Sequence, residues 1–404
     1  MVCSTQIKTL NTRISPLLIL QLGVIVKSLT IPLLYYILKV LYIREHQKLE
    51  NMSIDILLKR NENSNLSTYD QDNITFGKNF TDHMFIADFD GEKWGDFRIV
   101  PTGELSVHPA NAMWHYGQSI FEGMKAYKNT KGEAFLFRPL ENANRLNHSA
   151  VRMCMPEIPN EIFMDGLQTL MSLDKQWIPD RQGSSLYIRP FMMAWDTFLG
   201  VRPSTTYRFM IICSPAGKYY AEPVRVKIET EYSRAAPGGT GHAKAAGNYA
   251  GSMYPTKMAM EAGYQQIIWT DSKEHKYVEE AGTMNLMFMY KGVLTTSPVS
   301  DTILNGITRK TVIAIAKDWG VPVNEHQVDV YELTNAIKNG EVTEAFGVGT
   351  AATIAQIKTI ALEGVDFDLP TITDDMFQVK INTYLEDIRK GNVEDKFGWR
   401  EEII

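Results

Sequence analysis

The sequence predicts an α+β protein built from two α/β halves, and three observations lead to this fold class. Between residues 84 and 177, short β-like runs bounded by turn residues precede two helical segments. A second succession of strands and helices begins near residue 224 and continues to the end. The Gly/Pro/Ala-rich segment 216–223 separates the two series. A chain of 404 residues is long enough for two separate cores, so each half can fold around its own.

The first half is predicted from short β-like runs bounded by turn residues and from one helical repeat. Residues 141–153 have helical character, and residues 161–177 show an amphipathic repeat typical of a helix. Two later runs, 185–190 and 207–213, are strand-like. The earlier β-like runs lie at 84–89, 97–101, 104–109, 124–128 and 133–139.

The second half begins with the strand-like run 224–230 and a glycine-rich loop. A methionine-rich helix then leads to the apolar strand 265–270, and residues 376–390 are predicted as a terminal helix. We expect four regions: an N-terminal extension and polar arm outside the main fold (1–70), a smaller domain (71–221), an interdomain connection (222–236) and a larger domain (237–404).

Composition and charge exclude several classes of protein. The net charge is −6 and no block of basic residues stands out, which argues against nucleic-acid binding. The three cysteines, Cys3, Cys154 and Cys213, are too few and too scattered for a disulfide framework or a zinc site. We therefore expect no bound metal and a reducing, cytoplasmic location.

Residues 14–43 form an apolar region that is interrupted by Lys27 and Lys39 and by helix-breaking Pro32. No uninterrupted apolar run in it reaches the roughly 18 residues expected of a membrane-spanning helix. It could be a marginal membrane anchor, a partner-binding helix, or sequence upstream of the working start codon. We favour the last interpretation, with a start near Met52.

The segment 238–252 places a single lysine, Lys244, among glycines and alanines. Glycine allows a backbone to approach a ligand closely, and a lysine held by the main chain can be partly dehydrated. A dehydrated lysine supplies the free amine that a Schiff base requires. By itself such a lysine is more often an ordinary solvated charge, so other groups have to support this interpretation.

Four further segments supply groups that suit a phosphorylated pyridine aldehyde. Glu279 and Glu280 offer a carboxylate that could keep a pyridine nitrogen protonated, although such a pair is also typical of a solvated surface. The segment 306–308 begins a predicted helix, where free N–H groups favour phosphate. Thr350 in a small-residue turn and Arg145 could bind the same phosphate.

These motifs, in this order and spacing, resemble the branched-chain amino acid aminotransferases, which are class IV pyridoxal-phosphate enzymes of fold type IV. The resemblance covers residues from about 76 to the carboxyl terminus, and it implies a cofactor site between two α/β domains. The motifs that carry it are Lys-Ala-Ala-Gly-Asn-Tyr (244–249), Glu-Ala-Gly-Thr-Met-Asn (280–285), Gly-Ile-Thr-Arg (306–309), Gly-Val-Gly-Thr-Ala (347–351), Phe-Thr-Asp-His-Met (80–84), Phe-Glu-Gly-Met-Lys (121–125) and Leu-Tyr-Ile-Arg-Pro (186–190).

The resemblance implies a role for each matching residue. Lys244 would form the Schiff base with pyridoxal 5'-phosphate and then move the substrate's proton. Glu280 would face the pyridine nitrogen and Tyr249 the ring oxygen. The remaining cofactor-binding residues would be Arg145, Thr283, Ile307, Thr308 and Thr350.

The resemblance also implies a pocket for leucine, isoleucine or valine that accepts the γ-carboxylate of glutamate in the second half-reaction. Arg189, with tyrosine hydroxyls, would receive that carboxylate. A loop carrying Leu199 and Val201 would reach the neighbouring subunit's active site, so a homodimer is expected. The other expected substrate-binding residues are Phe80, Tyr116, Phe121, Tyr187, Tyr219 and Ala351.

The predicted activity is transamination of branched-chain amino acids with 2-oxoglutarate by a ping-pong mechanism. Two alternatives share the fold, a D-amino-acid transaminase and an aminodeoxychorismate lyase. A third alternative is a membrane-tethered binding protein that has lost the active site, but Lys244, Glu280, Tyr249 and Arg145 are all present and argue against it.

Overall fold

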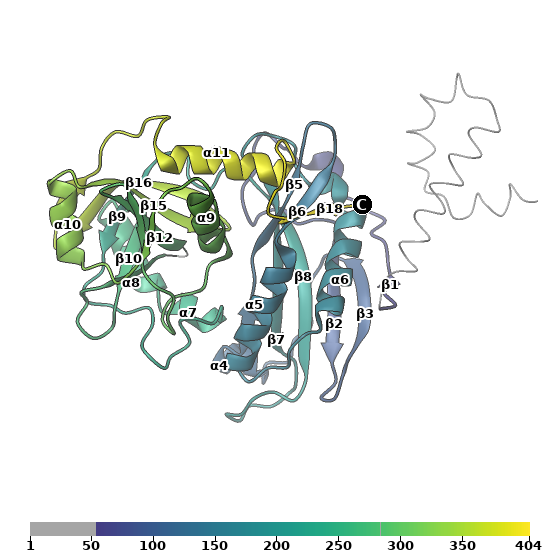
Figure 1. Ribbon diagram of the computed structural model, residues 1–404. Coiled ribbons are helices and arrows are strands. Elements are labelled where there is room, and N and C mark those ends of the chain that lie inside the picture. The colour runs from purple at the N-terminus through teal and green to yellow at the C-terminus, as the bar shows by residue number, and fades with distance from the viewer. Residues whose placement is uncertain (1–53, 283) are drawn as a thin grey trace, which may run out of the picture. The chain divides into compact units, whose positions relative to one another are not determined.

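The first half of the chain forms a mainly antiparallel sheet that is covered on one face by two helices (Figure 1). The computed structural model describes residues 54–282 and 284–404. The helices are α4 (Ala112–Tyr116), α5 (Pro139–Arg152) and α6 (Asn160–Leu173), with 3-10 turns at Leu66–Thr68 and Lys175–Trp177. Among the described residues the strand order is β1 (Leu57–Leu58), β3 (Trp94–Pro101), β2 (His83–Phe89), β8 (Tyr207–Ala216), β7 (Ser185–Ala194), β5 (Met124–Lys128), β6 (Ala134–Phe137) and β18 (Arg400–Ile403), with β4 (Ser119–Phe121) paired to β7.

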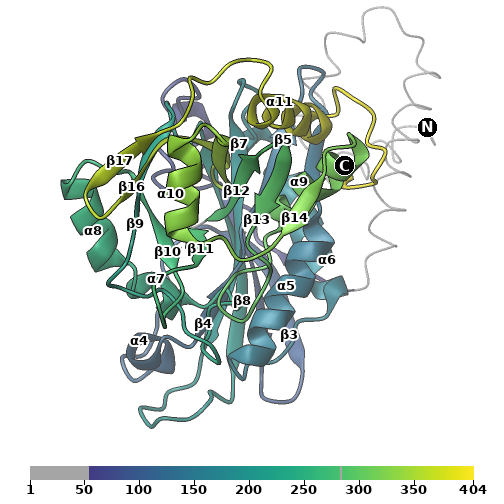
Figure 2. The same ribbon diagram turned by 60° about the vertical axis from the view of Figure 1, so that its left-hand side comes forward.

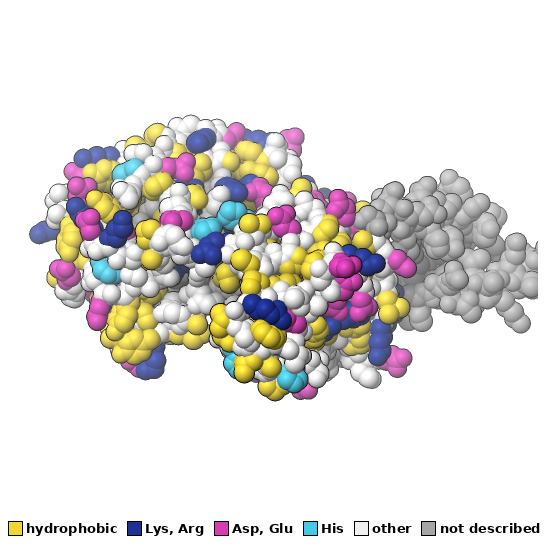
Figure 3. Space-filling view, turned by 90° about the horizontal axis from the view of Figure 1, so that it is seen from below, with side chains coloured by type: hydrophobic (Ala, Val, Ile, Leu, Met, Phe, Trp, Pro, Cys, Tyr) yellow, Lys and Arg dark blue, Asp and Glu magenta, His cyan; other side chains and the backbone are white. Residues whose placement is uncertain are grey.

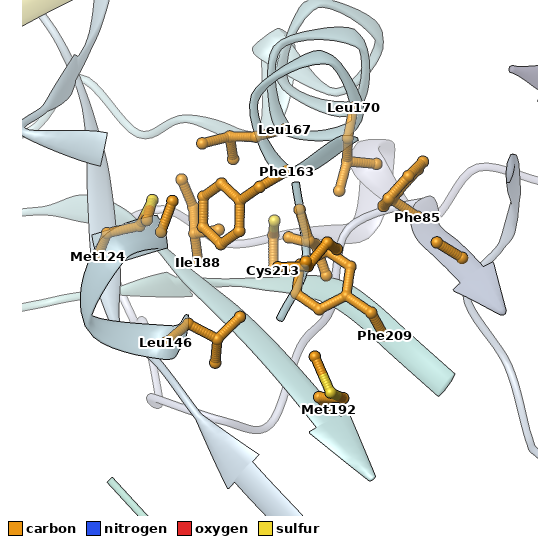
Figure 4. Packing of buried hydrophobic residues seen from close by; sticks show 14 of the residues in the cluster. Phe85, Met124, Leu146, Phe163, Leu167, Leu170, Ile188, Met192, Phe209 and Cys213 are labelled. Carbon is orange, nitrogen blue, oxygen red and sulfur yellow. The ribbon is translucent and has the colours of Figure 1, made fainter. Parts of the chain in front are cut away.

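The core of this half lies between the sheet and helices α5 and α6 (Figure 4). The apolar positions of α6, including Phe163, Leu167 and Leu170, point at strand residues such as Phe209. In β5, Met124 and Ala126 belong to this core. Since side chains alternate along a strand, Lys125 and Tyr127 lie on the opposite face of the sheet.

The second half forms another sheet, in which six strands close into a ring because β11 pairs with both β10 and β12 (Figure 2). The helices of this half are α7 (Ala246–Ala250), α8 (Met253–Glu261), α9 (Ile307–Asp318), α10 (Val330–Lys338) and α11 (Phe377–Lys390). Its described strands follow the order β11 (Val278–Ala281), β10 (Gln266–Thr270), β9 (Val224–Ile228), β16 (Thr353–Leu362), β15 (Val342–Gly349), β12 (Met284–Tyr290), β13 (Val293–Thr296) and β14 (Val323–Glu325), with β17 (Val365–Asp368) paired to β16.

The α+β class is confirmed, and most predicted elements lie within a few residues of the observed ones. The strand predicted at 104–109 is wrong. Its residues do alternate between exposed and half-buried, and Leu105 packs on the Met84 cluster. The neighbouring strands are already paired on both sides, because β2 is flanked by β3 and β8, and β3 is flanked by β2 and β1. The alternating exposure of residues 104–109 therefore reflects side-chain packing against the Met84 cluster, and not hydrogen bonding to a neighbouring strand.

Two features of the topology bear on the predicted domain boundaries. β9 lies inside the range 222–236, which was expected to be a connection, and it is part of the second sheet. After α11 the chain returns to the first sheet, where β18 pairs antiparallel with β6 (Figure 1). Residues 54–404 make up one compact unit. The apolar segment 14–43 lies outside the described residues.

Candidate active site

Lys244 is held by its main chain from both sides. Its N–H donates to Ser149 Oγ of α5 (3.0 Å), and its carbonyl accepts from the Phe121 N–H of β4 (3.0 Å). The loop before it folds tightly, because a Cβ at Gly241 would come within 2.7 Å of the Thr302 carbonyl oxygen. The glycine-rich sequence therefore permits a close approach of two backbones beside the lysine.

The amine of Lys244 lies between two aromatic rings. Its Nζ donates to the Tyr249 hydroxyl (3.0 Å) and lies 4.9 Å from the centre of the Phe121 ring. Tyr249 comes from α7, only one turn beyond the lysine, whereas Phe121 comes from the other half of the chain. The structure therefore brings Lys244, Tyr249 and Phe121 together.

Glu280 is buried on β11 and is oriented by groups from two other segments. The Leu304 N–H donates to its Oε1 (2.5 Å), and Arg234 Nη2 forms an ion pair with its Oε2 (3.1 Å). Burial raises the pKa of Glu280, while the positive charge of Arg234 opposes that rise. Glu280 and Tyr249 line the same small cavity of about 20 Å³.

The loop 300–304 connects Glu280 with the lysine loop, and this role was not predicted from the sequence. The Asp301 carbonyl accepts from the His242 N–H (3.0 Å), and its carboxylate accepts from the Gly238 N–H (2.6 Å). The Thr302 carbonyl accepts from Arg234 (2.5 Å), which holds Glu280. Neither Arg234 nor Asp301 belongs to a sequence motif that we singled out, so the sequence did not identify them as site residues.

Arg145 extends from α5 to the residues just before α9, and the start of α9 is where a phosphate was predicted to bind. Its Nη1 donates to the Asn305 carbonyl (3.2 Å), two residues before Ile307, and Gly306 is the N-cap residue of the helix. Arg145 also makes a bidentate ion pair with the fully buried Glu122, at 2.6 and 2.8 Å. Glu122 was not predicted as a site residue. It stands inside the Phe-Glu-Gly-Met-Lys motif, but the sequence does not show that it pairs with Arg145.

The turn that carries Thr350 and Ala351 is tied to the first half of the chain. Thr350 Oγ1 donates to the Gly123 carbonyl (3.1 Å), and Lys125 Nζ donates to the Ala351 carbonyl (2.8 Å). Thr283, the remaining predicted cofactor residue, lies outside the described residues, and its role stays a prediction. Of the other predicted cofactor residues, Tyr249 and Glu280 lie at the site of Lys244. Arg145 contacts the segment just before Ile307 and Thr308, and Thr350 contacts Gly123.

A second cavity of about 300 Å³ adjoins this turn. The predicted residues Tyr187, Tyr219 and Ala351 line it, and so do Phe76 and Lys125, which were not predicted. Burial, together with the charge of nearby Arg389, lowers the pKa of Lys125 to about 7. None of the ion pairs among residues 54–282 and 284–404 includes Lys125. Two sequence signals could have identified Lys125: its place in the Phe-Glu-Gly-Met-Lys motif and its alternation with the core residues of β5.

Arg189 lies beside Tyr187 and Phe121 on the same sheet face. Its Nη2 donates to the Tyr187 hydroxyl (2.8 Å), and its guanidinium carbon lies 4.6 Å from the Phe121 ring centre. Its Nε is buried and makes no hydrogen bond within the described part of the chain. A buried donor without a partner is costly, so this atom is suited to an anionic ligand.

The other predicted substrate residues are exposed and do not line this cavity. Phe80 is 42% exposed and lies three residues before the start of β2 at His83. Tyr116 donates to the Leu199 carbonyl, which brings these two residues together within one chain. Val201 is 85% exposed at the tip of the β7–β8 connection.

Glu279 is buried next to Glu280, and its side chain accepts from Thr302 Oγ1 (2.5 Å). Burial raises the pKa of Glu279 to about 7; Thr302 and Arg234 oppose this, while the charges of Glu280 and Asp271 add to it. The ordinary value is 4.5, so the folded chain holds a proton that the unfolded chain releases. This contribution to stability is complete below about pH 4.5 and is lost as the pH rises through about 7.

Replacing Glu279 by glutamine should therefore remove part of the pH dependence of stability. We expect Glu279→Gln to equal the wild type in Tm near pH 5 and to exceed it at pH 8, because the glutamine never ionises. Thermal unfolding at both pH values measures this difference. Glu92→Gln, at an exposed glutamate, serves as the control and should show no such divergence. Equal Tm differences at the two pH values would contradict the prediction.

Two searches of the described residues, 54–282 and 284–404, bear on other expectations. They contain no group of three or more histidine, cysteine or acidic side chains that could hold a metal ion. They also contain no helix long and apolar enough to cross a membrane. Cys213 is buried and Cys154 exposed, and both are free thiols.

Comparison with protein families places the chain among the aminotransferases. The model of the family "Amino-transferase class IV" matches residues 119–360. The branched-chain-amino-acid aminotransferase 2 of Bacillus subtilis (strain 168) is 44% identical over 338 residues, which cover 83% of this chain and 93% of that protein. A branched-chain-amino-acid aminotransferase of Mycolicibacterium smegmatis is 40% identical over 333 residues, or 80% of this chain and 90% of that one.

Solved structures agree with this placement. The branched-chain aminotransferase of the archaeon Thermoproteus uzoniensis, solved with norvaline, superimposes with a TM-score of 0.68 at 27% identity, covering 80% of this chain and all of that one. The Escherichia coli branched-chain amino acid aminotransferase gives a TM-score of 0.66 at 28% identity over 80% and 99% of the two chains. With the lysine site, the matched family and these relatives in agreement, this chain belongs to the branched-chain amino acid aminotransferases of class IV, with fold type IV.

Proposed function

We propose that the protein is a pyridoxal-phosphate-dependent transaminase that converts L-leucine, L-isoleucine and L-valine, with 2-oxoglutarate, into their 2-oxo acids and L-glutamate. The observation that carries this proposal is the amine of Lys244 beside the Tyr249 hydroxyl at 3.0 Å, in a site that also holds the buried Glu280. An amine, an acid and a phosphate-binding helix start are the three kinds of group that a phosphorylated pyridine aldehyde requires.

The donor set fits pyridoxal 5'-phosphate. Glu280 would hold the proton on the pyridine nitrogen, and Tyr249 would donate to the ring oxygen. Arg145, the backbone N–H groups of Ile307 and Thr308, and Thr350 would hold the phosphate. When bound, the cofactor supplies an electron sink that stabilises negative charge at the substrate Cα.

Lys244 would act on the proton at the substrate Cα. Its main chain is fixed at both N and O, so the amine moves only through its own side-chain torsions. A positioned amine that accepts and returns a proton accelerates such a transfer by roughly 10²- to 10⁴-fold. Phe121 and Tyr249, whose ring centres are 4.9 Å apart, would flank this transfer.

The cavity at Ala351 would receive the carboxylate that every substrate carries. Lys125 brings a buried amine there, without a counter-ion among the described residues, and a bound carboxylate would favour its charged form. The free Nε of Arg189 would take the second carboxylate of glutamate. Aromatic side chains nearby, Phe121 and Tyr187, suit an aliphatic substrate side chain in the other half-reaction.

We also propose a homodimer in which the β7–β8 connection of one subunit reaches the active site of the other. Phe198, Leu199 and Val201 on this connection and Trp114 and Tyr116 on α4 are large and exposed. Figure 3, which views the molecule from below Figure 1, shows hydrophobic side chains at the surface of that face. Exposed apolar side chains gathered in this way are typical of an interface.

The location and the division into domains remain proposals. Scattered free thiols and an acidic pI near 5.8 support a reducing, cytoplasmic environment. The ranges 71–221 and 237–404 would form most of the two α/β domains, with the cofactor between them, while β9 adds to the second sheet and β18 to the first. The contacts of Arg145 with Asn305 and of Lys125 with Ala351 support a site at their junction.

The visible absorption spectrum of the purified protein with pyridoxal phosphate tests the proposed function. We expect a band that L-leucine bleaches and 2-oxoglutarate restores, because the two half-reactions run in turn. A response to D-alanine and none to L-leucine would instead indicate a D-amino-acid transaminase. The absence of any band after incubation with the cofactor would contradict the enzymatic assignment.

A further inference from the structure

Helix α5 of the first half contacts the loop that carries the reactive lysine, residues 238–244, at three points. Arg152 donates through Nε and Nη2 to two carbonyls at the start of this loop (3.2 and 3.1 Å). One turn earlier in the helix, the His148 ring packs edge-on against His242, with the ring centres 5.3 Å apart. The third contact is made by Ser149. The loop is therefore held along its length by one side of α5.

Ser149 is fully buried, and its hydroxyl bonds both to the lysine and to its own helix. It accepts from the Lys244 N–H (3.0 Å) and donates to the Arg145 carbonyl one turn earlier in α5 (3.0 Å). A backbone N–H can only donate, so the hydroxyl proton is left for the carbonyl and the oxygen is left for the lysine. Because the bond to the helix fixes the Ser149 side chain, the acceptor that Lys244 meets has a defined position.

The same turn of α5 reaches both ends of the proposed cofactor site. Arg145 and Ser149 are four residues apart, which places them on one face of the helix. Arg145 donates to the Asn305 carbonyl just before α9, where the phosphate is proposed to bind, while Ser149 accepts from Lys244. One helical turn therefore fixes the spacing between the phosphate end of the site and the main chain of the lysine.

The carbonyl side of Lys244 has its own anchor, which the serine does not share. The Phe121 N–H donates to the Lys244 carbonyl (3.0 Å), and Ala245 forms an antiparallel bridge with Ile120. Ala243 and Ala245, on either side of the lysine, are both 2% exposed, so an N–H that lost its acceptor here would have little access to water. Without the serine hydroxyl, the peptide before Lys244 would turn towards another acceptor about this fixed carbonyl end and carry the amine with it.

We propose that Ser149 is a positioning residue for the reaction: through the Lys244 main chain it sets where the amine meets the proton at the substrate Cα. This inference rests on the proposed function. Ser149 does not line the cavity at Ala351, so its contribution belongs to proton transfer and not to substrate binding. A displacement of a reacting group by about 1 Å can cost about 10²-fold in rate, which makes the main-chain position of Lys244 important.

Steady-state kinetics of Ser149→Ala with L-leucine and 2-oxoglutarate tests this proposal. We expect kcat to fall about 10- to 100-fold while KM stays within about twofold of the wild-type value. The cofactor absorption band should remain, because the groups proposed to hold the phosphate are unchanged. With leucine deuterated at Cα, the isotope effect on kcat should increase, because proton transfer becomes the slower step.

Two further variants separate the hydroxyl from the packing at this position. Ser149→Thr and Ser149→Val add nearly the same bulk, but only the first keeps a hydroxyl. The kcat of the threonine variant should therefore exceed that of the valine variant by about tenfold, even if both are less stable than wild type. Ser172→Ala is the matched control: it removes a hydroxyl of α6 that donates to the Ile404 carbonyl, and it should leave kcat and KM unchanged.

Hydrogen–deuterium exchange of the holoprotein, followed by mass spectrometry on peptides that contain Lys244, gives a readout without turnover. Exchange of the Lys244 amide should be about tenfold faster in Ser149→Ala than in wild type, and unchanged in Ser172→Ala. Unchanged exchange, an unchanged kcat, a loss that appears in KM instead of kcat, or equal kcat values for the threonine and valine variants would each overturn the proposal. If the wild-type spectrum does not respond to leucine, the proposed function fails by itself, and the exchange result still decides whether Ser149 holds the lysine.

Discussion

Replacing Lys244 by alanine is expected to abolish transamination, with a fall in kcat of at least about 10⁴-fold, because the variant loses both the nucleophile and the proton carrier. No other described amine donates to Tyr249, and no second lysine lies over Phe121. The absorption band expected for the loaded wild type should be missing in this variant. Stopped assays with L-leucine and 2-oxoglutarate measure the loss of activity.

The control for this experiment is Lys257→Ala, which removes an exposed lysine of α8 that pairs with Glu261. That variant should keep both the absorption band and the activity. Circular dichroism should show that Lys244→Ala remains folded, because its backbone hydrogen bonds to Ser149 and Phe121 do not involve the side chain. Substantial turnover by Lys244→Ala would contradict the role assigned to this lysine.

Replacing Glu280 by glutamine is expected to reduce kcat by about 10²- to 10³-fold with little change in cofactor occupancy. A neutral amide cannot hold the proton on the pyridine nitrogen as a carboxylate does, so the developing negative charge at the substrate Cα is less stabilised. The groups proposed to bind the phosphate, around Arg145 and α9, do not contact Glu280 directly and should still retain the cofactor. Single-turnover kinetics measures the chemical step, and the cofactor absorbance measures occupancy.

Glu279→Gln is a matched control, since it changes the neighbouring carboxyl on the same strand. Glu280 is held by Leu304 and Arg234, whereas Glu279 is held by Thr302, so the two substitutions affect different contacts. We expect the Glu279 variant to keep most of the wild-type kcat. Similar losses in the two variants would mean that the effect comes from general disturbance of β11 and not from the pyridine nitrogen.

Much of this site could be predicted because its signals are local. Lys244 and Tyr249 are five residues apart, and their loop needs glycine for reasons that the sequence shows directly. The start of α9 follows from the helical repeat after Gly306, and the N-cap residue was found there. The alternation of β5 correctly separates core from opposite-face residues. In each case a repeat or a turn within about one element determines the outcome.

The tertiary structure alone decided which residues meet across the chain. Glu122 pairs with Arg145, Ser149 holds Lys244 and Ala351 holds Lys125, over separations of 23, 95 and 226 residues. Phe76 reaches the cavity because the segment 54–82 follows the first sheet, and no periodicity in its residues predicts that path. The predicted strand at 104–109 failed for the same reason, since alternation identifies a face but supplies no partner. The sequence by itself determined the chemical groups and their local geometry, whereas strand register and chain path determined their neighbours, because a hydrogen-bonded pairing depends on both segments at once.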